Sequence, residues 1–138
     1  MCKVPGKVSL VTGGSRGIGS AIVEKLAKNG SNVAFTYLSS PEKAQELISK
    51  LEIYPVKIRA YASDASNHQA SKDLITQVVA DFGGLDILVN NAGITKDNLL
   101  MRMTEEQWDQ VMNINLKSAF NLTKFAVTQM MRQRSGSI

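Results

Sequence analysis

Three glycines follow a short apolar run near the start of the chain, and their spacing is suited to phosphate binding. Gly13, Gly17 and Gly19 lie between the apolar run 7–11 and a stretch with apolar residues at helical spacing. In such a strand-to-helix turn the glycines let the backbone approach a pyrophosphate closely, and free N–H groups at the helix N-terminus face it. Ordinary β–α turns share this pattern, so the prediction depends on the residues in the rest of the chain.

Polar and small residues recur after each later apolar run. They occupy positions 37–40, 64–65 and 90–93. Each set alone is typical of a turn. If the strands are parallel, however, all of these loops lie at one edge of the sheet, where open α/β sheets bind their ligands.

The order of the predicted elements favours a parallel sheet. We expect strands at 7–11, 32–37, 56–61 and 85–89, a fifth strand starting at 136–138, and helices between them. Ser66 and Thr104 each begin a capping-box pattern, and the second opens a long helix at 105–132. Alternation with short loops predicts an α/β fold with a doubly wound, Rossmann-type sheet.

The composition is that of one ordinary domain. The 138 residues are 43% hydrophobic with a net charge of +4, which favours an anionic cofactor or acidic partner over nucleic acid. Cys2 is the single cysteine, so a reducing compartment is expected. No apolar run has transmembrane length and no signal peptide is predicted, which favours the cytoplasm. No metal site is expected, and the single histidine, His68, is predicted to cap a helix or lie at the surface.

Two motifs together carry a family resemblance. Thr12-Gly13-x-x-x-Gly17-x-Gly19 and Asn90-Asn91-Ala92-Gly93 resemble the signature pair of the short-chain dehydrogenase/reductase family. The resemblance covers 6–138. The run 91–103, NAGITKDNLLMRM, is similar to a narrower branch, the bacterial 3-oxoacyl-[acyl-carrier-protein] reductases of fatty-acid synthesis.

The resemblance implies roles for individual residues. Those implied to bind the dinucleotide phosphates are Gly13, Gly14, Ser15, Arg16, Gly17, Ile18 and Gly19. Asp64 and Ala65 would flank the adenine, with Asp64 accepting from its exocyclic amine. Asn91, Ala92 and Gly93 would lie along the adenosine ribose, and Asn91 would also hold the fourth strand in place.

Asn115 matches the helix asparagine of the family's catalytic tetrad, whose backbone holds a water of the proton relay. Taken from the sequence alone, Asn115 is better explained as a residue that merely bends the long helix.

The end of the second strand predicts the choice of cofactor. A site for NAD places a carboxylate there to bind the ribose 2′-hydroxyl, but the residues at 35–40 include no acid. Arg16 is positioned to reach a 2′-phosphate, and Ser39 offers a hydroxyl. We therefore expect NADP(H) as the cofactor. The alternative for Arg16 is a charged loop residue that is only solvated and binds no phosphate.

The long helix has more apolar surface than one sheet contact requires. A stripe at helical spacing is predicted to pack on the sheet: Trp108, Met112, Leu116, Phe120, Thr123, Val127 and Met131. Leu122 and Phe125 lie off that stripe and are predicted to face a second chain, giving a homo-oligomer, a dimer or tetramer, through 105–132. Arg134 matches a carrier-protein contact of the resembled reductases, although helix capping explains it as well.

The family's catalytic Ser and Tyr-x-x-x-Lys motif have no counterpart in these residues. Lys does not occupy the fourth position after Tyr37, Tyr54 or Tyr61. The expectation is the NADP-binding part of a reductase that converts 3-oxoacyl to 3-hydroxyacyl groups on acyl carrier protein, inactive as 138 residues alone. The alternatives are a non-catalytic dinucleotide-binding fragment and a reductase of another carbonyl substrate.

Overall fold

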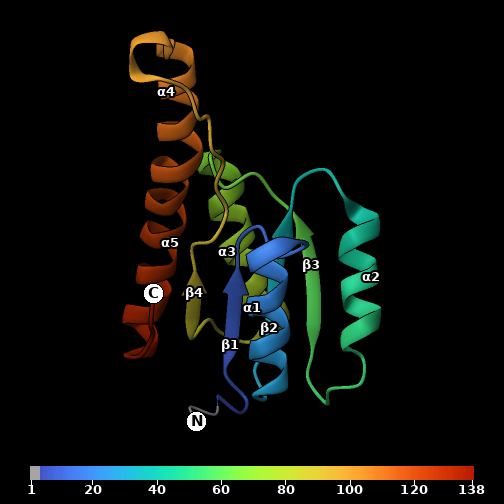
Figure 1. Ribbon diagram of the computed structural model, residues 1–138. Coiled ribbons are helices and arrows are strands. Elements are labelled where there is room, and N and C mark those ends of the chain that lie inside the picture. Colours follow the sequence, from blue (N-terminus) through green and yellow to red (C-terminus); the bar gives the residue numbers. More distant parts are fainter. Residues whose placement is uncertain (1–3) are drawn as a thin grey trace.

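A parallel sheet of four strands forms the centre of the protein. The computed structural model describes residues 4–138, so Cys2 lies outside the described part (Figure 1). The strands are β1 (Val8–Val11), β2 (Asn32–Tyr37), β3 (Ile58–Ala62) and β4 (Ile87–Val89). Their order in the sheet is β3-β2-β1-β4, and Leu10 of β1 lies level with Ala34 and Leu88 on its two neighbours.

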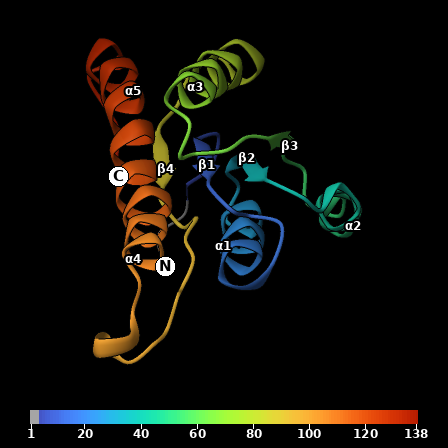
Figure 2. The same cartoon turned by 90° about the horizontal axis from the view of Figure 1, so that it is seen from above.

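Helices cover both faces of the sheet, as the doubly wound prediction requires. They are α1 (Gly17–Lys28), α2 (Pro41–Leu51), α3 (His68–Phe82), α4 (Glu105–Val111) and α5 (Ser118–Gln133). The first two share one core cluster with Val11 and Phe35, and α3 and α5 share the other with Leu10. Figure 2 shows these helix pairs on opposite sides of the sheet. Neighbouring strand residues point to opposite faces, so both faces of β1 are buried.

The predicted elements are present, with differences at their ends. The strand and helix order agrees with the sequence analysis, although β3 and β4 are shorter and shifted toward their C-terminal ends. Thr104 forms the predicted capping box, but Ser66 does not. Asn67 is the N-cap of α3, and its side chain accepts from Ala70 N. At the predicted start of a fifth strand, Ser137 forms one isolated parallel bridge with Ile87 of β4.

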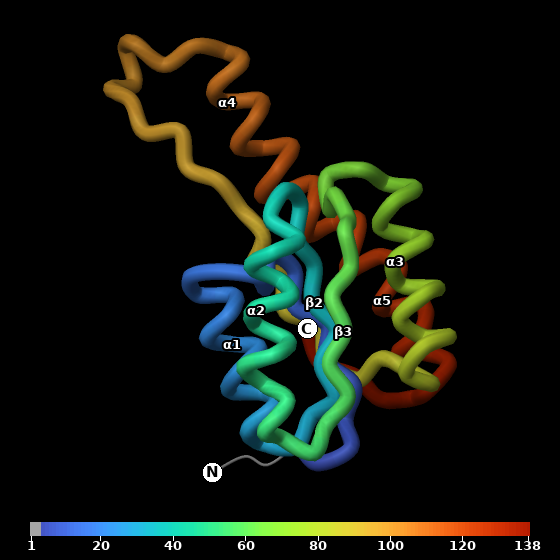
Figure 3. Tube along the Cα trace, turned by 90° about the vertical axis from the view of Figure 1, so that its right-hand side faces the viewer, coloured from blue at the N-terminus to red at the C-terminus, as the bar shows by residue number. Residues whose placement is uncertain are grey.

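The long helix is continuous, but one segment of it has π-helical geometry. That segment, η2 (Met112–Lys117), joins α4 to α5 and contains Asn115. A short 3₁₀ helix, η1 (Leu100–Arg102), precedes α4. Figure 3 shows that α4 and the segment before it extend well beyond the sheet.

The predicted orientation of the long helix was wrong. The residues of α5 that pack toward the sheet are Leu122, Ala126 and Met130. Phe120 of the predicted stripe is 59% exposed. Two apolar faces run along this helix, and the π-helical segment changes the rotational phase between α4 and α5. A single stripe therefore cannot face the sheet along the whole length.

Candidate functional site

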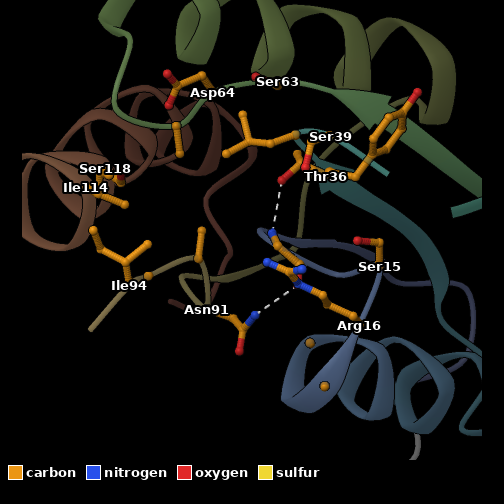
Figure 4. A pocket seen from close by; sticks show the side chains of 18 of the residues that line it. Ser15, Arg16, Thr36, Ser39, Ser63, Asp64, Asn91, Ile94, Ile114 and Ser118 are labelled. Atoms are coloured by element: carbon orange, nitrogen blue, oxygen red, sulfur yellow. Dashed lines mark hydrogen bonds between the residues drawn. The ribbon is translucent and has the colours of Figure 1, made fainter. Parts of the chain in front are cut away.

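A cavity of about 330 Å³ opens at the carboxyl ends of the strands. The loops that follow all four strands contribute to it, together with η2 and α5 (Figure 4). The sequence-predicted residues that line it are Gly13, Ser15, Arg16, Gly17, Ile18, Gly19, Ser39, Asp64, Ala65, Asn91, Ala92 and Gly93. The structure thus brings together loops that are up to 80 residues apart in the chain.

The N-terminus of α1 forms one wall and is built to receive an anion. Gly13 has a φ of +64°, a conformation that favours glycine. A Cβ on Gly19 would overlap the carbonyl oxygen of Gly13 and lie 2.7 Å from Asn91 Nδ2. Arg16 is the N-cap of α1, and its side chain makes no capping hydrogen bond. The first N–H groups of α1 are therefore available to a phosphate at this wall.

Gly14 is an exception among the predicted loop residues, because it does not line the cavity. Its N–H donates to the carbonyl of Thr36 at 2.8 Å. A Cβ at this position would lie 2.5 Å from the Cβ of Phe35. The glycine is required for packing of the loop on β2.

Thr12 and Asn91 join the first loop to the fourth. The hydroxyl oxygen of Thr12 accepts the N–H of Asn91 at 3.0 Å and that of Ala92 at 2.9 Å. The Asn91 amide donates to the carbonyls of Thr12 and Gly13 at 2.9 and 3.2 Å. Because Thr12 is 2% exposed, these bonds fix the backbone of both loops.

Asn115 holds the backbone that leaves the fourth loop. Its side chain accepts the N–H of Ile94 at 2.8 Å and donates to the carbonyl of the same residue at 2.9 Å. Asn115 itself does not line the cavity, whereas its neighbours Ile114 and Ser118 do. The helix around Asn115 has π-helical geometry, a local departure from the regular α-helix.

Two charged side chains line the cavity. Arg16 makes no ion pair with any residue in 4–138. Asp64 Oδ1 accepts both the N–H and the hydroxyl of Ser66, at 2.9 and 2.7 Å. These bonds orient the carboxylate and leave its second oxygen without a partner in the described part of the chain.

Several lining residues were not predicted from the sequence: Thr36, Ser63, Ile94, Ile114 and Ser118. The cavity also includes Tyr37, Leu38 and Ser40, which belong to the predicted loop 37–40, and Thr36 directly precedes that loop. Ile114 and Ser118 have no sequence signal, because the turn of the long helix that faces the cavity depends on η2. Arg134 lies far from the cavity, at the opposite end of α5 (Figure 1), where its φ of 56° ends the helix.

Among residues 4–138, no three His, Cys, Asp or Glu side chains group as metal ligands. In the same residues, no helix combines the length and apolar character that crossing a membrane requires.

Comparison with known proteins decides the family. The profile of the short chain dehydrogenase family matches residues 7–138. The chain belongs to this family. The resemblance seen in the two sequence motifs is therefore confirmed, and the short chain dehydrogenase fold agrees with the sheet order found here.

Individual short chain dehydrogenases are similar over almost the whole chain. 3-Oxoacyl-[acyl-carrier-protein] reductase FabG of Staphylococcus aureus is 49% identical over 132 residues, 96% of this chain and 54% of the relative. FabG of Thermotoga maritima is 42% identical over 136 residues, 99% of this chain and 55% of the relative. The chain thus spans about half the length of the curated relatives it matches.

A solved short chain dehydrogenase has the same arrangement of elements. The enzyme of Burkholderia cenocepacia, determined in complex with NADP, superposes with a TM-score of 0.87 at 38% identity. The match covers 93% of this chain and 52% of that one.

Proposed function

We propose that the cavity binds NADP(H) and that the protein reduces 3-oxoacyl groups on acyl carrier protein to 3-hydroxyacyl groups. The observation that carries the proposal is the anion-binding wall at α1, assembled with the other three loops into one cavity. The similarity to FabG supports the substrate, and the NADP complex of the Burkholderia enzyme supports the cofactor. When bound, the cofactor supplies the hydride for the keto carbon.

The lining residues fit a dinucleotide in chemical type. In this proposal the phosphates bind the N–H groups at 15–19, where the absence of a Cβ on Gly19 lets the turn close on the carbonyl of Gly13. Asp64 presents its free oxygen to the adenine amine, with Ala65 beside the ring. Asn91, Ala92 and Gly93 lie along the ribose, at the backbone that Thr12 fixes.

Arg16 favours the phosphorylated form of the cofactor. Positions 35–40, at the end of β2, hold no carboxylate that would repel a 2′-phosphate or bind a free 2′-hydroxyl. Arg16 and Ser39 both line the cavity, and Arg16 is free to form charge-assisted hydrogen bonds. NADPH is therefore the proposed reductant rather than NADH.

Asn115 is proposed to take part in the proton relay. Its carbonyl oxygen accepts the N–H of Ser118, and a carbonyl oxygen has two lone pairs, so in this proposal the same atom also accepts from a water. The proton donor of the resembled reductases is a tyrosine followed by lysine at the fourth position, which residues 1–138 do not contain. We therefore expect these 138 residues alone to bind the cofactor without turnover.

The outer face of α4 and α5 is proposed to bind a second copy of the chain. The large exposed apolar residues along it include Trp108, Leu116, Phe120 and Met131. An apolar surface of this kind marks an interface between proteins. We therefore still propose a homo-oligomer, but through the face that carries Phe120 and not through the predicted face that carries Leu122.

Arg134 is proposed as a contact for the acidic carrier protein.

Turnover by the complete protein tests the proposal. We expect NADPH oxidation with a 3-oxoacyl thioester on acyl carrier protein, and much slower oxidation with an unrelated ketone. A faster reaction with the ketone would assign the enzyme to another carbonyl substrate. Cofactor binding without turnover of any carbonyl compound would favour a binding module. A protein that does not bind NADPH would contradict the proposal altogether.

A further inference from the structure

Asn121 is a buried amide that ties α5 to the loop carrying Asp64 and Ala65. The residue is 1% exposed. Its Nδ2 donates to the carbonyl oxygens of Ala65 and Ser66, at 3.0 and 3.2 Å. One amide group thus fixes two successive peptide units of the cavity wall.

Other side chains converge on the same loop. The hydroxyl of Ser71, on α3, shares its one hydrogen between the carbonyl of Ala65 at 3.1 Å and that of Asn67 at 2.9 Å. Asn121 Oδ1 lies 3.0 Å from His68 Nδ1, and the His68 ring packs on Phe125 with 4.9 Å between centroids. The carbonyl of Ala65 therefore receives donors from two different helices.

This arrangement is more than the packing of α5 requires. Leu122, Ala126 and Met130 already bury the inner face of the helix, and burying an amide has a desolvation cost that its hydrogen bonds only offset. What the amide adds is a defined position for the backbone of Ala65 and Ser66. Ser66 in turn holds the carboxylate of Asp64.

We infer that Asn121 is a positioning residue for the adenine end of the cofactor. It acts through the backbone of Ala65 and Ser66 and does not itself line the cavity. The inference rests on the proposed function, because it assumes that an adenine nucleotide occupies this end of the cavity. It adds a determinant outside the sequence motifs of the family.

The test compares two substitutions on α5 that each remove two hydrogen bonds to the backbone. Asn121→Leu removes the donors to Ala65 and Ser66, together with the contact to His68, and keeps the side-chain size. Gln133→Leu is the matched control, because Gln133 pairs with the N–H and carbonyl of Leu85, both at 3.0 Å, at the far end of the same helix. The complete protein is titrated with adenosine 2′,5′-bisphosphate and with NADPH, and each variant's melting temperature is measured.

We expect Asn121→Leu to raise the Kd for adenosine 2′,5′-bisphosphate about tenfold, on the scale of one to two lost hydrogen bonds. The KM for NADPH rises in parallel while kcat at saturating NADPH stays within about twofold. Gln133→Leu lowers the melting temperature and leaves the Kd and KM unchanged. This split separates positioning from a purely structural role.

Equal affinities in Asn121→Leu and Gln133→Leu would overturn the inference and leave the proposed function intact. A wild-type protein that binds neither nucleotide would overturn both. If Asn121→Leu does not fold, Ser71→Ala decides the matter, because it removes the second donor to the Ala65 carbonyl. A Kd raised about threefold, equivalent to part of one hydrogen bond, supports the inference, and an unchanged Kd refutes it.

Discussion

Replacing Thr12 by valine should separate the first and fourth loops of the cavity. Valine has nearly the shape of threonine but no oxygen. The N–H of Ala92 therefore loses its acceptor, whereas the N–H of Asn91 keeps the carbonyl of Val89 at 3.1 Å. Leaving a buried donor unsatisfied costs about 1–3 kcal/mol. Since one donor is left without an acceptor, we expect Thr12→Val to lower the free energy of unfolding by about 1–3 kcal/mol.

Urea unfolding of Thr12→Val and Thr12→Ser measures this effect against a matched control. Serine keeps the acceptor and loses one methyl group, which costs about 1 kcal/mol. With a slope near 2 kcal/mol per M, the valine variant should unfold about 0.5–1.5 M earlier than wild type, and the serine variant about 0.5 M earlier. Valine should also weaken NADPH binding more than serine. Equal midpoints for the two variants would refute the role given to the Thr12 hydroxyl.

Three further predictions concern other parts of the chain. Burial and the 2.6 Å hydrogen bond to Asp81 raise the pKa of Tyr61 above its usual value of 10.0. Tyr61→Phe should therefore cost about 1–2 kcal/mol of stability below pH 10, and the difference from wild type should shrink at higher pH, as followed by urea unfolding. Arg134→Gly should stabilise the fold by about 1 kcal/mol in thermal unfolding, because Arg134 has a left-handed backbone conformation. The same variant should bind acyl carrier protein more weakly, and an affinity equal to that of wild type would contradict the proposed contact. Phe120→Glu should shift sedimentation toward the monomer with little change in stability, and an unchanged mass would exclude this face as the interface.

The features predicted from the sequence are those encoded locally. The glycine-rich turn at 13–19 and the alternation of apolar runs define β–α units, and short loops between them require parallel strands. Parallel strands in turn bring their C-terminal loops to one edge. The meeting of the predicted residues in a single cavity therefore followed from topology, without knowledge of any side-chain contact.

The features that escaped prediction depend on contacts between distant segments. The orientation of α5 could not be chosen from its sequence, because both of its faces are apolar and η2 changes their phase. Gly14 resembles its neighbours in the motif, yet it is required by Phe35 on β2. Asn121 carries no local signal, since its partners Ala65 and Ser66 belong to another loop.

The central claim is that this cavity binds the 2′-phosphorylated dinucleotide through Arg16. Its most direct test is the ratio of the dissociation constants for NADH and NADPH, measured by nucleotide fluorescence in the wild type and in Arg16→Ala. A charge-assisted contact of about 1.5–3 kcal/mol predicts a preference for NADPH of about 10- to 100-fold in the wild type, lost in the variant mainly through weaker NADPH binding. Equal affinities in the wild type, or a preference that survives in Arg16→Ala, would contradict the account.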